Sequence, residues 1–297
     1  MMGRVVSVGN FDGCHAGHQK IFERIKEIAE EKHLIPAVVS FEPHTRYVLA
    51  PSGAPQLLTT LAEKKEFVES LGLEFITLPF NPELAGMPFD SFVSTVLIPS
   101  IGTEYMVFGH DHHFGAAGRG SFDSFTEAFP KMLSEKLPAV MIGSTLVSSS
   151  VIRELLLKGD LKQSREFLGK PYRIRGTVVP GKQLGRTLGF PTANLEPETH
   201  KLIPKNGVYA GRVILSDHSV HRAVINIGCQ PSVGGKSLVV EAHLLQFSGD
   251  LYGATLNIDL LEFLRPEKKF GSIEELKAGI TADAAAVSGF FDPLPDA

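Results

Sequence analysis

The hydrophobic residues in the first half of the chain gather in short runs that alternate with segments of helical periodicity. Strands separated by helices in this way are typical of a parallel sheet with crossover helices. We therefore expect an α/β domain in this half. The runs are rich in β-branched side chains and lie at Val5–Val8, Pro36–Phe41, Phe75–Leu78, Tyr105–Gly109 and Ala139–Ile142.

The helical segments of this half are marked by apolar residues that recur every three or four positions. Within Gln19–Lys32, the isoleucines at positions 21, 25 and 28 share one face of a helix that we expect to begin just after His18. Two further helices are predicted at Ser121–Lys136 and Ser148–Lys158.

After about Gly169 the pattern changes to many short apolar runs separated by glycine and proline. Short strands at this spacing indicate an antiparallel barrel or sandwich. Helical periodicity returns at Ile273–Ala278 and Ala282–Val287. We place the boundary within Leu161–Pro171 and divide the chain into domains of residues 1–168 and 169–297. The strands are predicted at Tyr172–Val179, Val208–Leu215, His221–Ile227, Leu238–Leu244 and Leu256–Phe263.

The composition supports two globular domains. A chain of 297 residues exceeds the roughly 250 residues at which single cores stop growing. A net charge of −4 argues against nucleic acid as a partner, and Cys14 and Cys229 suggest reduced thiols. The sequence predicts no signal peptide and no membrane span. We expect a cytoplasmic enzyme, monomeric or weakly homo-oligomeric, without a membrane partner.

The segment Gly9-Asn10-Phe11-Asp12-Gly13-Cys14-His15-Ala16-Gly17-His18 follows a predicted strand and opens a helix. Backbone N–H groups and the helix dipole attract phosphate at such a place, and two histidines three residues apart can aim at one anion. The pattern His-x-Gly-His is typical of nucleotidylyltransferases. Histidines that only cap the helix or bind an adventitious metal are the alternative.

Three consecutive serines open the helix predicted at Ser148–Lys158, and Arg153 follows one turn later. Hydroxyl groups at a helix N-terminus and a guanidinium suit phosphate binding. Serines at this position are also good N-caps, which is the alternative interpretation.

A glycine-rich segment, Gly181–Asn194, has the composition of a loop that covers phosphates. Thr192 and Asn194 lie two residues apart, so their oxygens project to one face of an extended segment, where they could hold Mg²⁺ beside ATP. An ordinary turn is the alternative. The segment lacks the Gly-Lys-Ser/Thr ending of a Walker A loop.

Strand alternation within Val239–Leu244 places Glu241 and His243 on one face and Val240 on the other. A carboxylate at this position could accept the proton of an attacking hydroxyl during phosphoryl transfer. A solvated glutamate on a strand face is the alternative.

Taken together, these motifs resemble those of the bacterial bifunctional riboflavin kinase/FAD synthetase family over essentially the whole chain. The resemblance implies a Rossmann-like nucleotidylyltransferase domain followed by a small antiparallel β-barrel of riboflavin kinase type with a terminal helix. Besides the segments above, it is carried by Ser40–His44, Leu58–Thr60, Phe108–Gly115, Gly207–Tyr209, Asn226–Gly228, Leu251–Gly253 and Leu264–Phe270.

The resemblance also implies two ATP-dependent reactions, from riboflavin to FMN and from FMN to FAD, with Mg²⁺ bound by Thr192 and Asn194 and with Glu241 as the base. His15, His18, Ser149 and Arg153 would act on the phosphates during adenylyl transfer. The other expected ATP- or phosphate-binding residues are Gly9, Asn10, Gly17, Ser148, Gly181, Gly185 and Arg186, and the expected flavin or substrate residues are Asp12, Asp111, Asn226 and Arg265.

The chain departs from the family pattern mainly at His112 and His113, where Phe-Arg is common, and also at Thr45 and Ser150. Loss of the fixed cation motivates an alternative, a riboflavin kinase with a weakened or altered adenylyltransferase half. His110, His112 and His113 are too close along the chain to surround one metal ion in a regular strand. A flavin-binding or regulatory protein without turnover is a third possibility, which the retained base and histidines argue against.

Overall fold

The computed structural model describes residues 2–181, 185, 188–232 and 235–290. The chain divides into two compact units, Met1–Ser149 and Ser150–Ala297. The segment in which we expected the domain boundary forms a helix, α8 (Leu161–Leu168), which contacts strands of the second unit. Helix α7 (Ser149–Lys158) precedes it and accepts a hydrogen bond at the carbonyl of Leu156 from the amide of Lys205, 3.1 Å away.

The first unit is built on a parallel sheet of five strands in the order β3-β2-β1-β4-β5, as the alternation of runs and helices predicts. Its strands are β1 (Arg4–Val8), β2 (Ile35–Glu42), β3 (Glu74–Pro79), β4 (Thr103–Phe108) and β5 (Leu133–Lys136). The longer helices are α1 (Ala16–Lys32), α3 (Leu61–Ser70), the π-helix η2 (Val93–Ile101) and α6 (Phe122–Ala128). The shorter ones are α2 (Thr45–Leu49), α4 (Pro82–Gly86), α5 (Phe89–Phe92) and the 3₁₀ turns η1 (Pro51–Gly53) and η3 (Ala116–Gly118).

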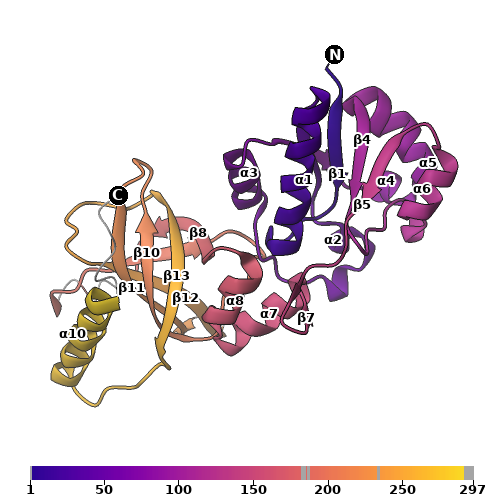
Figure 1. Ribbon diagram of the computed structural model, residues 1–297. Coiled ribbons are helices and arrows are strands. Elements are labelled where there is room, and N and C mark those ends of the chain that lie inside the picture. Colours follow the sequence, from indigo (N-terminus) through magenta and orange to yellow (C-terminus); the bar gives the residue numbers. More distant parts are fainter. Residues whose placement is uncertain (1, 182–184, 186–187, 233–234, 291–297) are drawn as a thin grey trace. The chain divides into compact units, whose positions relative to one another are not determined.

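Both faces of this sheet are buried. Val5 and Val38 enter the core shared with α1, whereas their neighbours Val6 and Val39 enter the core on the opposite face. Figure 1 shows α1 and α3 on one side of the sheet and α5 and α6 on the other. Strands buried on two faces carry near-continuous apolar runs, which explains why the sequence shows runs here and not alternation.

Three predicted elements of the first unit differ from the structure. Helix α1 begins at Ala16, because the ring of His15 caps it and a cap leaves no trace in hydrophobic periodicity. The helix predicted at Ser121–Lys136 is wrong in its second half, since α6 ends before Pro130 and the chain continues as strand β5. The strand predicted at Ala139–Ile142 shrinks to β6 (Met141–Ile142), paired with β7 (Thr145–Leu146).

The second unit is a closed antiparallel barrel in the order β10-β11-β12-β9-β8-β13, which settles the choice between barrel and sandwich. Only β9, which carries Asn194, was not predicted as a strand. The strands are β8 (Tyr172–Val179), β9 (Ala193–Pro197), β10 (Gly207–Ile214), β11 (Val220–Ser232), β12 (Gly235–Leu244) and β13 (Thr255–Arg265).

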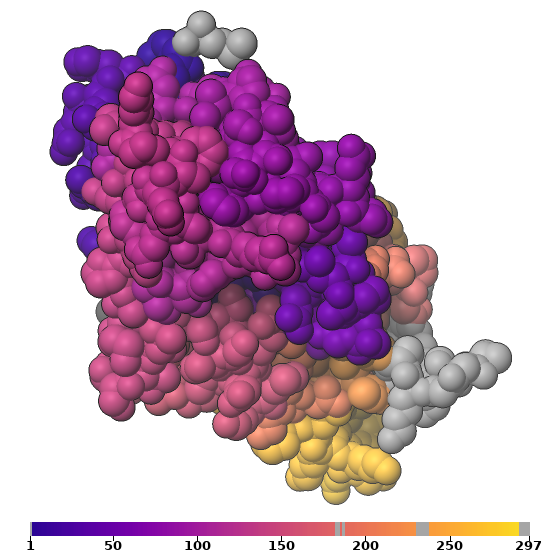
Figure 2. Space-filling model, turned by 90° about the vertical axis from the view of Figure 1, so that its right-hand side faces the viewer, coloured from indigo at the N-terminus to yellow at the C-terminus, as the bar shows by residue number. Residues whose placement is uncertain are grey.

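The two helical segments predicted near the C-terminus form one continuous helix, α10 (Ile273–Phe290). It packs on the barrel through Val287, which shares a cluster with Val208 and Val224. Figure 2 shows α10, in yellow, at the surface of its unit. Among the described residues, no helix has the length and apolarity needed to cross a membrane.

Candidate functional sites

The first candidate site lies where the order of the parallel strands reverses. Strands β1 and β4 are neighbours, and their following connections lead to opposite halves of the sheet. Ligands of open α/β sheets bind beyond the carboxyl ends of strands at such a switch point. The loop Gly9–His15 follows β1 and the loop Gly109–Phe114 follows β4, so the fold brings both motifs to this place.

The rings of His15 and His18 stack on each other, with centroids 3.6 Å apart and planes inclined by 16°. The backbone amide of His18 donates to Nδ1 of His15 over 3.4 Å, so the neutral ring of His15 carries its proton on Nε2. A Cβ atom at Gly17 would lie 3.2 Å from the ring of His15, so glycine at this position leaves room for the ring. The two histidines thus form one preorganised pair at the N-terminus of α1.

His15 is neutral at neutral pH. Burial lowers its pKa to about 4, and the nearby carboxylates of Asp12 and Asp111 oppose that shift only in part. The side chain is buried, with 6% of its surface exposed. A neutral imidazole with its proton on Nε2 can donate a hydrogen bond to an anion without requiring a net charge in this buried place.

Two expected ligand residues of this loop are engaged with the protein itself. Asn10 donates from Nδ2 to the hydroxyl of Thr45 over 2.8 Å and accepts from the amide of Thr45 over 3.2 Å. Asp12 is buried and accepts from the amide of Thr59 over 3.0 Å. These contacts hold the loop to the segments that follow β2 and precede α3.

Ser149 also meets this loop, because its hydroxyl donates to the backbone oxygen of Asp12 over 2.9 Å. Ser148 is half-buried beside it, and the amide of Gly9 donates to the carbonyl of Val39 over 2.9 Å. Arg153 lies one turn further along α7 and is half-buried. It falls in the second compact unit, so its assignment to the phosphates rests on the sequence.

The loop after β4 places His112 and His113 in different surroundings. The ring of His112 packs between Phe108 and Phe114, with centroids 5.3 and 5.5 Å apart respectively, and burial lowers its pKa to about 4. His113 is exposed, and its Nδ1 lies 2.9 Å from the backbone oxygen of Asp111. Asp111 itself is exposed. Within the described residues, no group of three or more His, Cys, Asp or Glu side chains is arranged to hold a metal ion.

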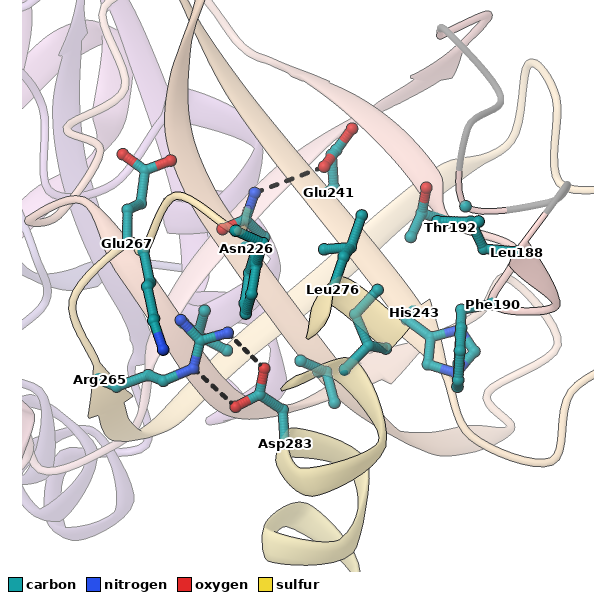
Figure 3. Close-up of a pocket in the computed structure, with 16 residues that line it drawn as sticks. Leu188, Phe190, Thr192, Asn226, Glu241, His243, Arg265, Glu267, Leu276 and Asp283 are labelled. Atoms are coloured by element: carbon teal, nitrogen blue, oxygen red, sulfur yellow. Dashed lines mark hydrogen bonds and ion pairs between the residues drawn. The ribbon is translucent and has the colours of Figure 1, made fainter. Parts of the chain in front are cut away.

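The second candidate site is a cavity of about 390 Å³ between the wall of the barrel and helix α10 (Figure 3). Strands β10, β11, β12 and β13 and helix α10 contribute to its walls, together with the glycine-rich segment before β9. Apolar side chains and polar or charged ones contribute in similar numbers, so the cavity offers both flat apolar walls and groups that can orient a ligand. The apolar lining residues include Leu188, Phe190, Val208, Val224, Phe270, Leu276 and Ile280.

Glu241 and His243 both line this cavity, whereas Val240, on the opposite face of β12, is fully buried, as strand alternation predicts. The amide nitrogen of Asn226 donates to Glu241 Oε2 over 3.4 Å. His243 is held by a 2.8 Å contact between its Nδ1 and the backbone oxygen of Pro191. Glu241 is therefore a half-buried carboxylate inside a concave site and not a solvated residue on an open strand face.

Arg265 lines the same cavity from the end of β13. Its guanidinium forms two hydrogen bonds with the carboxylate of Asp283 on α10, of 2.8 and 2.6 Å. These bonds raise the pKa of Arg265 above its usual range. Asp283 had no place in the sequence analysis, because nothing in the local pattern distinguishes it from a solvated acid on a helix.

Thr192 and Asn194 lie close to Glu241 in the barrel wall. Asn194 is the direct cross-strand partner of Glu241 where β9 pairs with β12. The side chain of Asn194 covers the backbone of Gly181, since a Cβ atom there would lie 2.1 Å from Nδ2. Gly185 accepts at its carbonyl from the amide of Phe190 over 2.8 Å, and Arg186 lies outside the described residues.

A second cavity of the barrel, of about 500 Å³, lies beside the first and shares Thr192 with it. Asn194, Ala242 and Leu244 line it from the strands, and the segment 247–252 encloses it with Phe247 and Tyr252. Sequence reasoning gave these two aromatic residues no role. Their proximity to a glycine, Gly249, and an acid, Asp250, is the only local signal of a binding loop.

Comparisons with known proteins place this geometry among its relatives. The family model of FAD synthetase matches residues 1–151, and that of riboflavin kinase matches residues 168–291. The bifunctional riboflavin kinase/FMN adenylyltransferase of Pseudomonas fluorescens is 36% identical over 295 residues, which cover 98% of this chain and 94% of that protein. Its namesake from Escherichia coli K12 is 33% identical over 292 residues, 97% of this chain and 93% of that one.

A solved structure from Streptococcus pneumoniae, titled as a macrolide-efflux protein, superposes with a TM-score of 0.87. It is 28% identical in sequence, and the match covers 97% of this chain and 94% of that one. The likeness extends over both compact units.

Proposed function

This chain belongs to the family of bifunctional riboflavin kinases/FMN adenylyltransferases, and on that premise we propose that each of its two domains, residues 1–168 and 169–297, performs one reaction. The protein acts in FAD biosynthesis: it phosphorylates riboflavin to FMN and adenylylates FMN to FAD, with ATP as the co-substrate of both steps. The barrel domain carries the first reaction and the parallel-sheet domain the second.

In the barrel, Glu241 accepts the proton of the terminal ribityl hydroxyl as that oxygen attacks the γ-phosphorus of ATP. The bond from the γ-phosphorus to its bridging oxygen breaks, and ADP leaves. The observation that carries this assignment is the position of Glu241, which lines a cavity of about 390 Å³ and pairs with Asn194 across β12 and β9. Asn226 orients the carboxylate by its hydrogen bond to Oε2.

Thr192 and Asn194 offer the hydroxyl and amide oxygens that Mg²⁺ accepts, and both line the second cavity of the barrel, the one of about 500 Å³. Their chemistry therefore fits the cation that accompanies ATP. When bound, Mg²⁺ neutralises charge on the β- and γ-phosphates. The chain's own part is to hold these two oxygens beside Glu241.

The two cavities of the barrel divide the substrates between them. The cavity of Asn226, Glu241 and Arg265 takes the flavin, whose flat apolar rings match the walls formed by Phe190 and α10. The cavity of Phe247 and Tyr252 takes the adenosine of ATP. Thr192 lines both, so the γ-phosphate and the hydroxyl meet beside it. The glycine-rich segment with Gly181, Gly185 and Arg186 covers the phosphates.

In the parallel-sheet domain, a phosphate oxygen of FMN attacks the α-phosphorus of ATP, and pyrophosphate leaves as the bond to the β-phosphate oxygen breaks. The attacking group is already anionic, so no strong base is needed. His15 and His18 donate to the phosphates from the stacked pair, together with Ser149 and the N–H groups of the glycine loop. A role for Arg153 at the phosphates rests on the sequence motif alone. Asn10 and Asp12 act by holding the loop through Thr45 and Thr59.

The alternative of a weakened adenylyltransferase now depends on His113 alone, since His112 keeps an aromatic environment. The ring of His112 packs between Phe108 and Phe114, surroundings that would also suit the phenylalanine common in the family. His113 alone changes the chemistry, because an exposed imidazole stands where a permanently charged arginine is common. We keep this alternative for that reason.

The test is a time course of the purified protein with riboflavin, ATP and Mg²⁺, with the flavins separated by chromatography. FMN followed by FAD is the expected result. FMN without FAD favours the alternative, and no product at all overturns the proposal. We further propose a cytoplasmic enzyme, monomeric or weakly homo-oligomeric.

A further inference from the structure

Lys64 is a buried lysine directly beneath the candidate adenylyl-transfer site. It lies in the first turn of α3, with 4% of its surface exposed, and its Nζ donates to the hydroxyl of Ser40 over 3.1 Å. In the part of the chain that the structure describes, this is its one hydrogen-bond partner, and it forms no ion pair. Burying an ammonium group without a paired carboxylate lowers the stability of the fold, so a lysine at this position indicates a functional role.

Lys64 is connected to the phosphate loop through Ser40. Ser40 is fully buried near the end of β2, and its hydroxyl donates to the backbone oxygen of Asn10 over 3.4 Å. The hydroxyl of Ser40 thus accepts from Lys64 and donates to the loop, an arrangement in which each hydrogen bond polarises the next. The helix that carries Lys64 also follows Thr59, which holds Asp12 and Gly13.

Burial lowers the pKa of Lys64 below its usual range, and the charges around it oppose that shift only in part. Asp12 and Glu42 act on it through space, but Asp12 is hydrogen-bonded to Thr59 and Glu42 is exposed. The third neighbouring group, Cys14, is a buried thiol. A fixed cation in a site of low dielectric attracts a polyanion more strongly than the same charge in water.

We propose that Lys64 is a positioning residue of FMN adenylylation, a buried cation that fixes the turn at Asn10 through Ser40 and adds positive potential where the phosphates of ATP and FMN meet. This inference rests on the proposed function of the first domain. It gives Lys64 no direct contact with substrate, since the loop lies between them.

The chain itself supplies matched controls. Lys65 is the next residue of α3, but its side chain is 58% exposed and lies 3.9 Å from Glu69. Lys65→Met therefore removes one positive charge at nearly the same sequence position without touching the loop. Riboflavin phosphorylation by the same molecules reports whether the barrel domain is intact, because that activity is assigned to it, and partial recovery in Lys64→Arg reports on the first domain.

The experiment measures kcat and KM for FAD formation from FMN, together with calorimetric binding of inorganic pyrophosphate, in the full-length protein. For Lys64→Met we expect kcat/KM to fall about 10- to 100-fold and pyrophosphate affinity to fall with it, while riboflavin phosphorylation and Lys65→Met stay within about twofold of wild type. Lys64→Arg should recover part of the loss, and Ser40→Ala should reduce kcat with a smaller effect on pyrophosphate affinity.

Unchanged kcat/KM and pyrophosphate affinity in Lys64→Met would overturn the inference. The inference would also fail if Lys64→Arg and Lys64→Met lost kcat/KM equally while Ser40→Ala kept the wild-type value. In that case the lysine side chain would only fill space. If the wild-type protein makes no FAD from FMN, the proposed function fails. Pyrophosphate binding then still tests the inference: weaker binding by Lys64→Met than by wild type supports a cation at this site, and equal binding contradicts it.

Discussion

Arg265 and Asp283 join strand β13 to helix α10 through two parallel hydrogen bonds, Nε to Oδ1 over 2.8 Å and Nη2 to Oδ2 over 2.6 Å. Asp283 is buried, with 7% of its surface exposed, and both residues line the cavity assigned to the flavin. Leu276 and Ile280 extend from the same helix into that cavity. The ion pair therefore fixes one wall of the flavin site.

Asp283→Asn should loosen α10 and weaken flavin binding. We expect KM for riboflavin to rise several-fold and the free energy of unfolding of the barrel to fall by about 2 kcal/mol, because a partly buried arginine loses its charged partner. Steady-state kinetics and chemical denaturation measure both. Glu274→Gln, an exposed acid of the same helix, is the control. If the two variants have the same KM for riboflavin, the ion pair does not contribute to flavin binding.

Glu241→Gln should abolish the first reaction and spare the second. Without the base, riboflavin phosphorylation should slow by about 100- to 10,000-fold, whereas FAD formation from supplied FMN should not change. Glu262→Gln on the exposed side of β13 serves as the control. Phosphorylation of riboflavin by Glu241→Gln at the wild-type rate would show that Glu241 is not the base.

The depressed pKa of His15 predicts a loss of stability in acid. Burial lowers this pKa from 6.5 to about 4, so the unfolded chain binds more protons than the folded one between these values. Stability is then fully present above pH 6.5 and falls as the pH drops, by about 3 kcal/mol from this residue. His15→Gln should flatten the acid branch of the unfolding free energy measured between pH 7 and pH 4.5. An unaltered acid branch would mean that His15 is not buried in its neutral form.

Gly181→Ala should damage the kinase site through Asn194. The added methyl group would lie 2.1 Å from Nδ2 of Asn194, so the amide must move away from its present place. We expect a higher Mg²⁺ concentration for half-maximal riboflavin phosphorylation, with normal adenylylation. Gly249→Ala changes a glycine of the other loop, at the second cavity, and should affect KM for ATP instead. A normal Mg²⁺ titration of Gly181→Ala would argue against Asn194 as a ligand.

His113→Arg should strengthen the second reaction. The variant restores a permanent positive charge at an exposed position beside Asp111, so KM for FMN or ATP in FAD formation should fall several-fold. His112→Arg is the contrasting change, because it places a charge between Phe108 and Phe114 and should destabilise the domain. If His113→Arg leaves both KM values unchanged, histidine in place of the family's common arginine does not weaken FAD formation.

The elements that local periodicity determines could be predicted from the sequence. The isoleucine stripe of α1 and the alternation of Glu241 with Val240 both match the structure. The strand β5 could not be found, because Leu133–Lys136 is a short edge strand with two exposed ends and no apolar run. Its existence depends on pairing with β4, which the local sequence does not encode.

Partners that are distant along the chain also escaped prediction. Asn10, Asp12 and Arg265 were expected to face substrates, and the structure ties their side chains to Thr45, Thr59 and Asp283 respectively. In the sequence the three partners are a threonine at the start of a helix, a threonine before a helix and an acid among alanines, and none of them stands out locally. Burial of Lys64 escaped notice for the same reason, since its neighbour Lys65 has the same chemistry and is exposed.

Strand β12 lines two cavities with alternate residues, Glu241 and His243 on one side and Ala242 and Leu244 on the other. A single inserted or deleted residue here would exchange the two sets, putting a carboxylate where adenosine is expected and a leucine where the proton must be taken. The spacing of this strand is therefore as tightly constrained as its chemistry. Changes of length should be tolerated only beyond Leu244, in the turn that leads to the loop of Phe247 and Tyr252.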